Sequence, residues 1–171
     1  EVYSRIAGEA RFLRAFYYSY LIEMYGGVPL VTTPVTSQEA LTYSRTPKDE
    51  IVDFLLNELD QAYEDLPLRY TPDDKAGATK GSALALKARI ALFNKRYKEA
   101  AAAAKSLMDL KVYSLHNNIT ELFQYSGQRS NNEVILEMQF SRGTRTHAQP
   151  QSYFSRMTGG YSEKVPLQSL V

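Results

Sequence analysis

The N-terminal segment of the chain carries a hydrophobic pattern with a helical period. Its apolar residues recur at steps of four and three, which predicts one stripe along a helix from about Val2 to Tyr25. The stripe comprises Ile6, Ala10, Leu13, Tyr17, Tyr20 and Met24, and a second apolar set comprises Phe12, Phe16, Leu21 and Tyr25. Because the helix is apolar on more than one side, we expect it to be an inner helix buried between neighbours. Gly26 and Gly27 favour a left-handed stop at its end, and Pro29 forces extended backbone.

A second helix is predicted after a connection of about 20 residues, which is long for a compact helical protein. The connection is rich in Thr, Ser, Val and Pro, and its length is typical of a functional or partner-contacting loop. Thr46 is a good N-cap, Pro47 suits the first helical position, and Asp49 and Glu50 lie near the positive helix end. The stripe of this helix, which Pro67 ends, comprises Ile51, Leu55, Leu59, Ala62 and Leu66.

Two further helices form a predicted hairpin. The first runs from about Thr79, its N-cap, to Asn94, and the second covers about Lys98–Leu110. The stripe of the first comprises Ala83, Leu86, Ile90 and Phe93. Small residues at Ala88 and Ala100 would let the two helices touch, and Tyr97 would fill the gap at the turn. This arrangement resembles a tetratricopeptide hairpin.

The pattern changes after the fourth helix. Ile119–Phe123 predicts one short helical turn. Glu133–Phe140 alternates apolar and polar residues, which predicts a half-buried strand with Val134 and Leu136 on its apolar side. The segment from Ser141 to Gly160 has no period and is expected to be irregular.

Composition limits the function classes. The chain has 171 residues, enough for one domain with a sizeable core, and no apolar run approaches the roughly 18–20 residues that span a bilayer. A formal net charge of +1 gives no electrostatic basis for a nucleic-acid partner. The absence of cysteine excludes disulfides, thiol catalysis and zinc–thiolate sites within this chain. The chain begins in helical register without an initiator Met, so we expect an internal piece of a longer polypeptide.

Candidate chemistry is sparse. His116 and His147 lie in predicted loops without carboxylates at metal-ligand spacing, and neither a nucleophile with a base nor a phosphate-binding glycine loop is present. We therefore expect no enzyme, no metal and no cofactor. The charged residues Glu9, Arg11 and Arg14 are expected to pair within and between helices rather than to contact a ligand.

Aromatic residues in the C-terminal segment are the candidate ligand-binding residues. Tyr153, Phe154 and Tyr161 lie close to Gln149 and Gln151, and flat aromatic faces with adjacent amides favour carbohydrate recognition. The alternative is that these aromatic side chains cover the helical core.

Several segments resemble the SusD/RagB family in the family's order. The strongest is Gly8–Val31, with GEARFLRAFYY followed by MYGGVPLV, and ATKGSALALKARIALF at 78–93 resembles a second recurring segment. The residues that start at Tyr97, at Tyr113 and at Asn131, and the closing segment 166–171, follow in the expected order. The resemblance implies a mainly α fold with tetratricopeptide-like hairpins over residues 1–112. It also implies an irregular region over 113–171, with a short strand near 133–140, in a fragment of a single SusD-like domain.

The resemblance also implies a function. Members of this family are surface-exposed outer-membrane lipoproteins that bind glycans or other nutrients, without cleaving them, for a SusC-like TonB-dependent transporter. Their lipid-bearing cysteine would lie upstream of residue 1, and this anchor would be the only attachment to the membrane. The alternative is a tetratricopeptide-type adaptor without a sugar ligand, which predicts flanking repeats of about 34 residues.

Overall fold

Helices dominate the computed structural model, which describes residues 2–70, 77–122, 124 and 132–137. All of these residues belong to one compact unit, 1–137, and the second unit, 138–171, lies outside the described residues. The long helices in the described part are α1 (Val2–Tyr25), α3 (Lys48–Asp65), α4 (Lys80–Phe93) and α5 (Tyr97–Asp109). The short helices there are α2 (Ser37–Ala40) and α6 (Ile119–Leu122). The prediction of a mainly α chain with four long helices and a short turn at α6 is confirmed, whereas α2 lies in the connection for which no helix was predicted.

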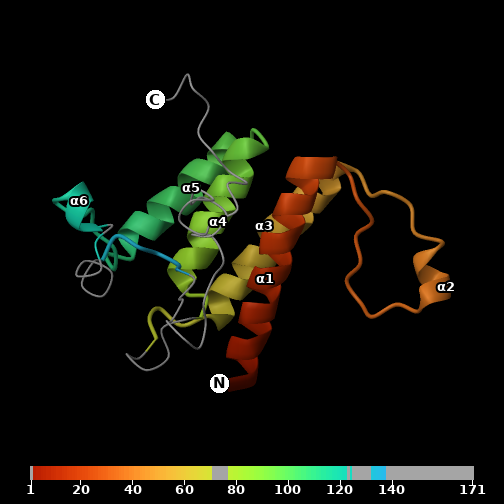
Figure 1. Ribbon diagram of the computed structural model, residues 1–171, viewed down its shortest axis with the longest axis horizontal. Helices are drawn as coiled ribbons and strands as arrows, with labels where there is room; N and C mark the ends of the chain where they lie inside the picture. The colour runs from red at the N-terminus through yellow and green to blue at the C-terminus, as the bar shows by residue number, and fades with distance from the viewer. Residues whose placement is uncertain (1, 71–76, 123, 125–131, 138–171) are drawn as a thin grey trace, which may run out of the picture. The chain divides into compact units, whose positions relative to one another are not determined.

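The long helices pack in series, α1 on α3, α3 on α4 and α4 on α5 (Figure 1). The predicted stripe of α3 is the centre of the core, and each of its five members is at most 2% exposed. Burying one such leucine or isoleucine contributes roughly 1.5–3 kcal/mol. The stripe comprises Ile51, Leu55, Leu59, Ala62 and Leu66, as expected from the sequence.

The α4–α5 hairpin confirms the predicted pair of helices, but its turn closes differently. Thr79 caps α4, because its hydroxyl accepts from the Ser82 N–H at 3.3 Å and its own N–H donates to the Ser82 hydroxyl at 2.6 Å. At the turn, Lys95 adopts a left-handed conformation with φ of 63°. The Lys95 N–H donates to the carbonyl of Leu92 at 3.1 Å, and the Arg96 N–H donates to a carbonyl in the last turn of α4 at 2.8 Å. Backbone bonds close the turn without an aromatic side chain. The expectation that Tyr97 fills the gap is wrong, since Tyr97 is 63% exposed.

Helix α1 has the predicted bounds but buries a different face. Its buried residues are Gly8, Phe12, Ala15, Ser19 and Ile22. The predicted stripe, represented by Leu13, Tyr17 and Met24, is exposed, so among the described residues α1 is not buried on several sides. The reason is close packing against α3: a Cβ added at Gly8 would lie 2.9 Å from the Cβ of Asp65. Small residues bring the helices together, and this selects one apolar face over the other.

Two local predictions are also wrong. Thr46 is not the N-cap of α3; Pro47 occupies that position, and the Thr46 N–H instead donates to the carbonyl of Val28 at 2.9 Å in an isolated antiparallel bridge. The part of the predicted strand that the structure describes, 133–137, is not a strand. Its burial is reversed, with Ile135 partly buried and its two neighbours exposed. The remainder of that prediction, residues 138–140, lies outside the described residues.

Candidate functional site

The predicted ligand-binding residues Tyr153, Phe154 and Tyr161 lie outside the described residues, as does His147. His116 lies in the described part, in a turn where its Nδ1 accepts from the Asn118 N–H at 3.1 Å. Within the described ranges, no group of three or more His, Cys, Asp or Glu residues is placed to hold a metal ion. No helix of this part is long and apolar enough to cross a membrane.

Charged residues of α1 pair with α3, as expected. Arg14 donates through Nε to Oε2 of Glu58 at 2.7 Å, and its Nη2 contacts the same oxygen. Glu58 is only 5% exposed, so its carboxylate is withdrawn from water, whereas the Arg14 side chain stays partly exposed. Arg11 makes a second pair with Asp65 at 2.5 Å. These arginines therefore join two helices and are not available for a ligand.

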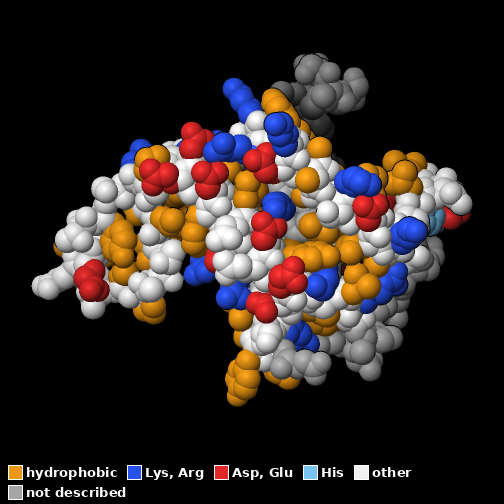
Figure 2. All heavy atoms as spheres, turned by 180° about the vertical axis from the view of Figure 1, so that it is seen from behind, with side chains coloured by type: hydrophobic (Ala, Val, Ile, Leu, Met, Phe, Trp, Pro, Cys, Tyr) orange, Lys and Arg blue, Asp and Glu red, His pale blue; other side chains and the backbone are white. Residues whose placement is uncertain are grey.

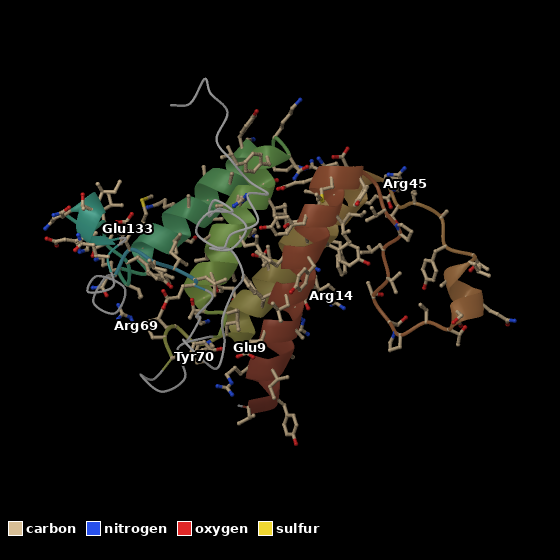
Figure 3. The ribbon with its side chains drawn as sticks, in the orientation of Figure 1. Glu9, Arg14, Arg45, Arg69, Tyr70 and Glu133 are labelled. Carbon is tan, nitrogen blue, oxygen red and sulfur yellow. The ribbon has the colours of Figure 1, made fainter. Side chains whose placement is uncertain are left out.

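A polar and aromatic cluster joins the first half of α1 to the segment that follows α3. The Tyr70 hydroxyl donates to Oε1 of Glu9 at 2.5 Å (Figure 3). The guanidinium carbon of Arg5 lies 5.7 Å from the centroid of the Tyr70 ring. Nearby, Tyr113 covers Gly81, where a Cβ would overlap its ring. These contacts fix the segment that follows α3 and the chain that leaves α5, so their role is structural.

An open groove lies beside α1 and α4. We call it the α1–α4 groove; it has a volume of about 610 Å³ and is lined by Phe12 and Phe16 of α1, Leu86 and Arg89 of α4, and segment 133–137. The phenylalanine rings lie 6.3 Å apart and nearly parallel. Such a groove can accept the apolar side of a ligand, with charged groups at its rim.

The connection between α1 and α3 has a built structure that periodicity did not reveal. We call residues 26–47 the α1–α3 loop. At its base, Arg45 donates through Nε to the Gly27 carbonyl at 2.6 Å and through Nη2 to the Tyr25 carbonyl. The Tyr18 hydroxyl accepts from the Val31 N–H at 2.8 Å, so α1 holds the first arm of the loop as well. In Figure 3, Arg45 lies at the root of the loop, at the end of α1 remote from Glu9.

The far end of the loop is a separately capped helix. The Thr36 hydroxyl accepts from the Glu39 N–H at 3.3 Å, and the Glu39 carboxylate accepts from the Thr36 N–H at 2.7 Å. The bond from the backbone N–H of Thr36, followed by the bond from its hydroxyl, lowers the pKa of Glu39. Every residue of α2 is exposed, and Figure 1 shows α2 at the far end of the loop, away from the long helices. The spacing of Thr36 and Glu39 is a capping-box signal that sequence reasoning missed.

Comparisons with known proteins match the helical part. A sequence profile of the SusD-like family, described as starch-binding and associating with the outer membrane, matches residues 1–92. The chain is similar to SusD-like protein P25 of Formosa agariphila, with 24% identity over 140 residues that cover 82% of this chain and 26% of that protein.

Solved structures agree with this match. A SusD-like carbohydrate-binding protein of Bacteroides fragilis superposes with a TM-score of 0.85 at 33% identity, over 93% of this chain and 31% of that one. A laminarin-binding SusD-like protein superposes with a TM-score of 0.76 at 28% identity, over 82% of this chain and 32% of that one. The chain thus spans about a third or less of the length of each of these relatives.

Proposed function

The chain belongs to the SusD-like family, and we propose that the protein binds a glycan at the outer-membrane surface without cleaving it. The observation that carries the proposal is the family match over 1–92 together with the superposition on a carbohydrate-binding relative at a TM-score of 0.85. One relative is described as binding laminarin, so a β-glucan is a reasonable first ligand to test. The match favours this function over the tetratricopeptide-type adaptor.

The proposal includes delivery of the glycan. We propose that the protein is a surface-exposed lipoprotein, held by a lipid anchor outside residues 1–171, and that it passes its ligand to a SusC-like TonB-dependent transporter. The helical part supports this proposal because it is suited to be a rigid scaffold: α1 and α3 are joined by both a buried apolar stripe and two ion pairs.

We further propose that Tyr153, Phe154 and Tyr161 contact the glycan. The reason is chemical, because aromatic faces beside amides suit the alternating apolar and hydroxyl surfaces of a sugar ring. The α1–α4 groove is a second candidate place for a sugar ring, against the half-buried Phe16.

The test uses the full-length protein. Binding to laminarin, starch and other polysaccharides is measured by affinity electrophoresis and calorimetry, and the sugar is analysed for products after incubation. We expect retention on at least one glycan and no products. Each aromatic residue is then replaced by alanine, with Tyr97→Ala as the control, because Tyr97 is exposed on the helical part. Failure to bind any glycan, or release of products, would contradict the proposed function; unchanged affinity of all three folded variants would contradict the site alone.

A further inference from the structure

We propose that two ion pairs between α1 and α3 select which of the two apolar faces of α1 packs on α3. The pairs are Arg11–Asp65 and Arg14–Glu58. A buried ion pair can specify one packing arrangement even where it adds little to stability. This conformational device is independent of the proposed glycan binding.

The two apolar faces lie on nearly opposite sides of α1. At 3.6 residues per turn, the centres of the buried face and of the exposed stripe are about 160° apart. The buried face comprises Gly8, Phe12, Ala15, Ser19 and Ile22. The exposed stripe comprises Ile6, Leu13, Tyr17, Tyr20 and Met24. Because the stripe carries more large apolar side chains than the buried face, burial of apolar area alone does not explain which face packs on α3.

The charges beside the buried face match those of α3. Arg11 and Arg14 lie on one flank of this face, and their partners on α3 are seven positions, or about two helical turns, apart. Arg11 lies 2.5 Å from Asp65, and Nε of Arg14 donates to Glu58 at 2.7 Å. Since both arginines are on the same flank, a single rotation of α1 about its axis satisfies both pairs.

The opposite rotation would bring like charges together. If the exposed stripe faced α3, the flank on the acidic side of α3 would carry Glu9 and Glu23, with Arg5 as its basic residue. Glu9 precedes Arg11 by less than one turn, so it would lie near the level of Asp65. Glu58, which is 5% exposed, would lose its cation, and a buried carboxylate without a partner is strongly unfavourable. Charge therefore opposes the packing that apolar area alone permits.

Ion pairs on the α4 side of α3 provide a matched control. Lys87 lies 2.5 Å from Asp60, and Arg96 lies 3.0 Å from Asp53. These two carboxylate side chains are 58% and 67% exposed, and acidic and basic side chains lie beside one another over the surface of the helical body (Figure 2). Exposed pairs are screened by water and contribute little, so reversal of their charges should leave α1 in place.

The experiment detects the buried face of α1 through one introduced thiol, since this chain has no cysteine. Ser19→Cys places the thiol on the buried face, where Ser19 is 6% exposed, and Tyr17→Cys places it on the stripe, where Tyr17 is 63% exposed. The rate of reaction with a chromogenic disulfide reagent is measured in the purified full-length protein. The same protein without the introduced cysteine gives the background, and circular dichroism at 222 nm records helix content.

Each thiol probe is combined with three sets of charge changes. The α1 reversal is Arg11→Glu/Arg14→Glu, the exchange adds Glu58→Arg/Asp65→Arg to it, and the control is Lys87→Glu/Arg96→Glu.

In the protein without charge changes, the Ser19→Cys thiol should react at least about tenfold more slowly than the Tyr17→Cys thiol. The α1 reversal should raise the Ser19→Cys rate at least about tenfold with helix content kept, the exchange should restore the slow rate, and the control should leave it slow. A slow rate after the α1 reversal, or a fast rate after the exchange or in the control, would overturn the inference.

A neutral variant decides the case in which the α1 reversal abolishes the helix signal. This variant, Arg11→Met/Arg14→Met/Glu58→Leu/Asp65→Leu, removes all four charges. A fast Ser19→Cys rate with helix content kept would support selection by charge. A slow rate, or loss of the helix signal, would show that the pairs only stabilise the contact and would overturn the inference.

Discussion

The ion pair between Arg14 and Glu58 provides the sharpest test of how α1 is held on α3. Replacing Arg14 with Met keeps an unbranched side chain over Phe54, whose ring the guanidinium now covers at 5.5 Å, but it leaves Glu58 without its cation. Removing one partner of a buried pair costs about 3–5 kcal/mol. Because the Arg14 side chain is 32% exposed, water can reach the vacated place, and we expect the lower end of that range, about 3 kcal/mol.

A double-mutant cycle isolates the interaction free energy of the Arg14–Glu58 pair from the other contacts of the two residues. The variant Arg14→Met/Glu58→Leu removes both charges, and it should lie within about 1 kcal/mol of the unmodified protein, because a buried ion pair is often replaced by apolar groups at little cost. The coupling between the two sites should then be at least about 2 kcal/mol. Urea unfolding followed by circular dichroism at 222 nm measures each free energy, since the signal reports helix content.

An exposed pair gives the control for this cycle. Lys105 and Asp109 lie 3.3 Å apart on α5 with both side chains more than 60% exposed, so Lys105→Met should change the free energy of unfolding by less than about 0.5 kcal/mol. The reasoning would be refuted if Arg14→Met cost less than about 1 kcal/mol, or if the double variant were as unstable as the sum of the two single variants.

Three further predictions concern backbone geometry and pH. Lys95→Gly should raise the free energy of unfolding by about 1 kcal/mol, because Lys95 is left-handed, whereas Ala101→Gly within α5 should lower it by about 1 kcal/mol; equal signs in urea unfolding would contradict this. Gly8→Ala should lower the free energy of unfolding by about 1–2 kcal/mol despite its better helix propensity, because the new Cβ meets Asp65; a gain in melting temperature would show that α1 can move away. The bonds to Thr36 lower the pKa of Glu39, so the α2 cap should persist at any pH above the ordinary glutamate pKa and be lost only as the pH falls through the lowered value. An NMR titration that gives Glu39 a pKa at or above the usual glutamate range would contradict the capping box.

Helix bounds were predictable because they depend on local signals. The cap at Thr79, the period of the α3 stripe and the stop at Gly26 are all set within a few residues of the chain, and Gly26 has the expected positive φ of 72°. The resemblance to the SusD/RagB family, based on ordered segments, is confirmed by the match over 1–92.

The buried face of α1 was not predictable from period alone. Both of its stripes are apolar, and hydrophobicity does not distinguish them. Gly8, Ala15 and Ser19 on the buried face carried the missing signal, because small residues mark the side on which a second helix can approach closely. Alternation likewise failed at 133–137, since a period of two predicts a strand only where a neighbouring strand is available for pairing, and the residues that the structure describes form no such strand.

The anchors of the α1–α3 loop were beyond local reasoning for a different reason. Tyr18 and Arg45 bind backbone atoms that are 11 to 20 positions away in the chain, and no spacing rule identifies such partners. The ligand-binding role of Tyr153, Phe154 and Tyr161 stays a prediction.

The serial packing of the long helices has a consequence for how the fold opens. Helix α5 packs on α4 alone among the long helices, and α1 packs chiefly on α3, while α3 and α4 are each held from two sides. Opening should therefore begin at the outer members and reach the middle pair last, as in a stack of nearest-neighbour units. Amide hydrogen exchange should accordingly be slowest along α3 and α4 and faster towards α5, so that protection increases from the outer helices to the inner pair.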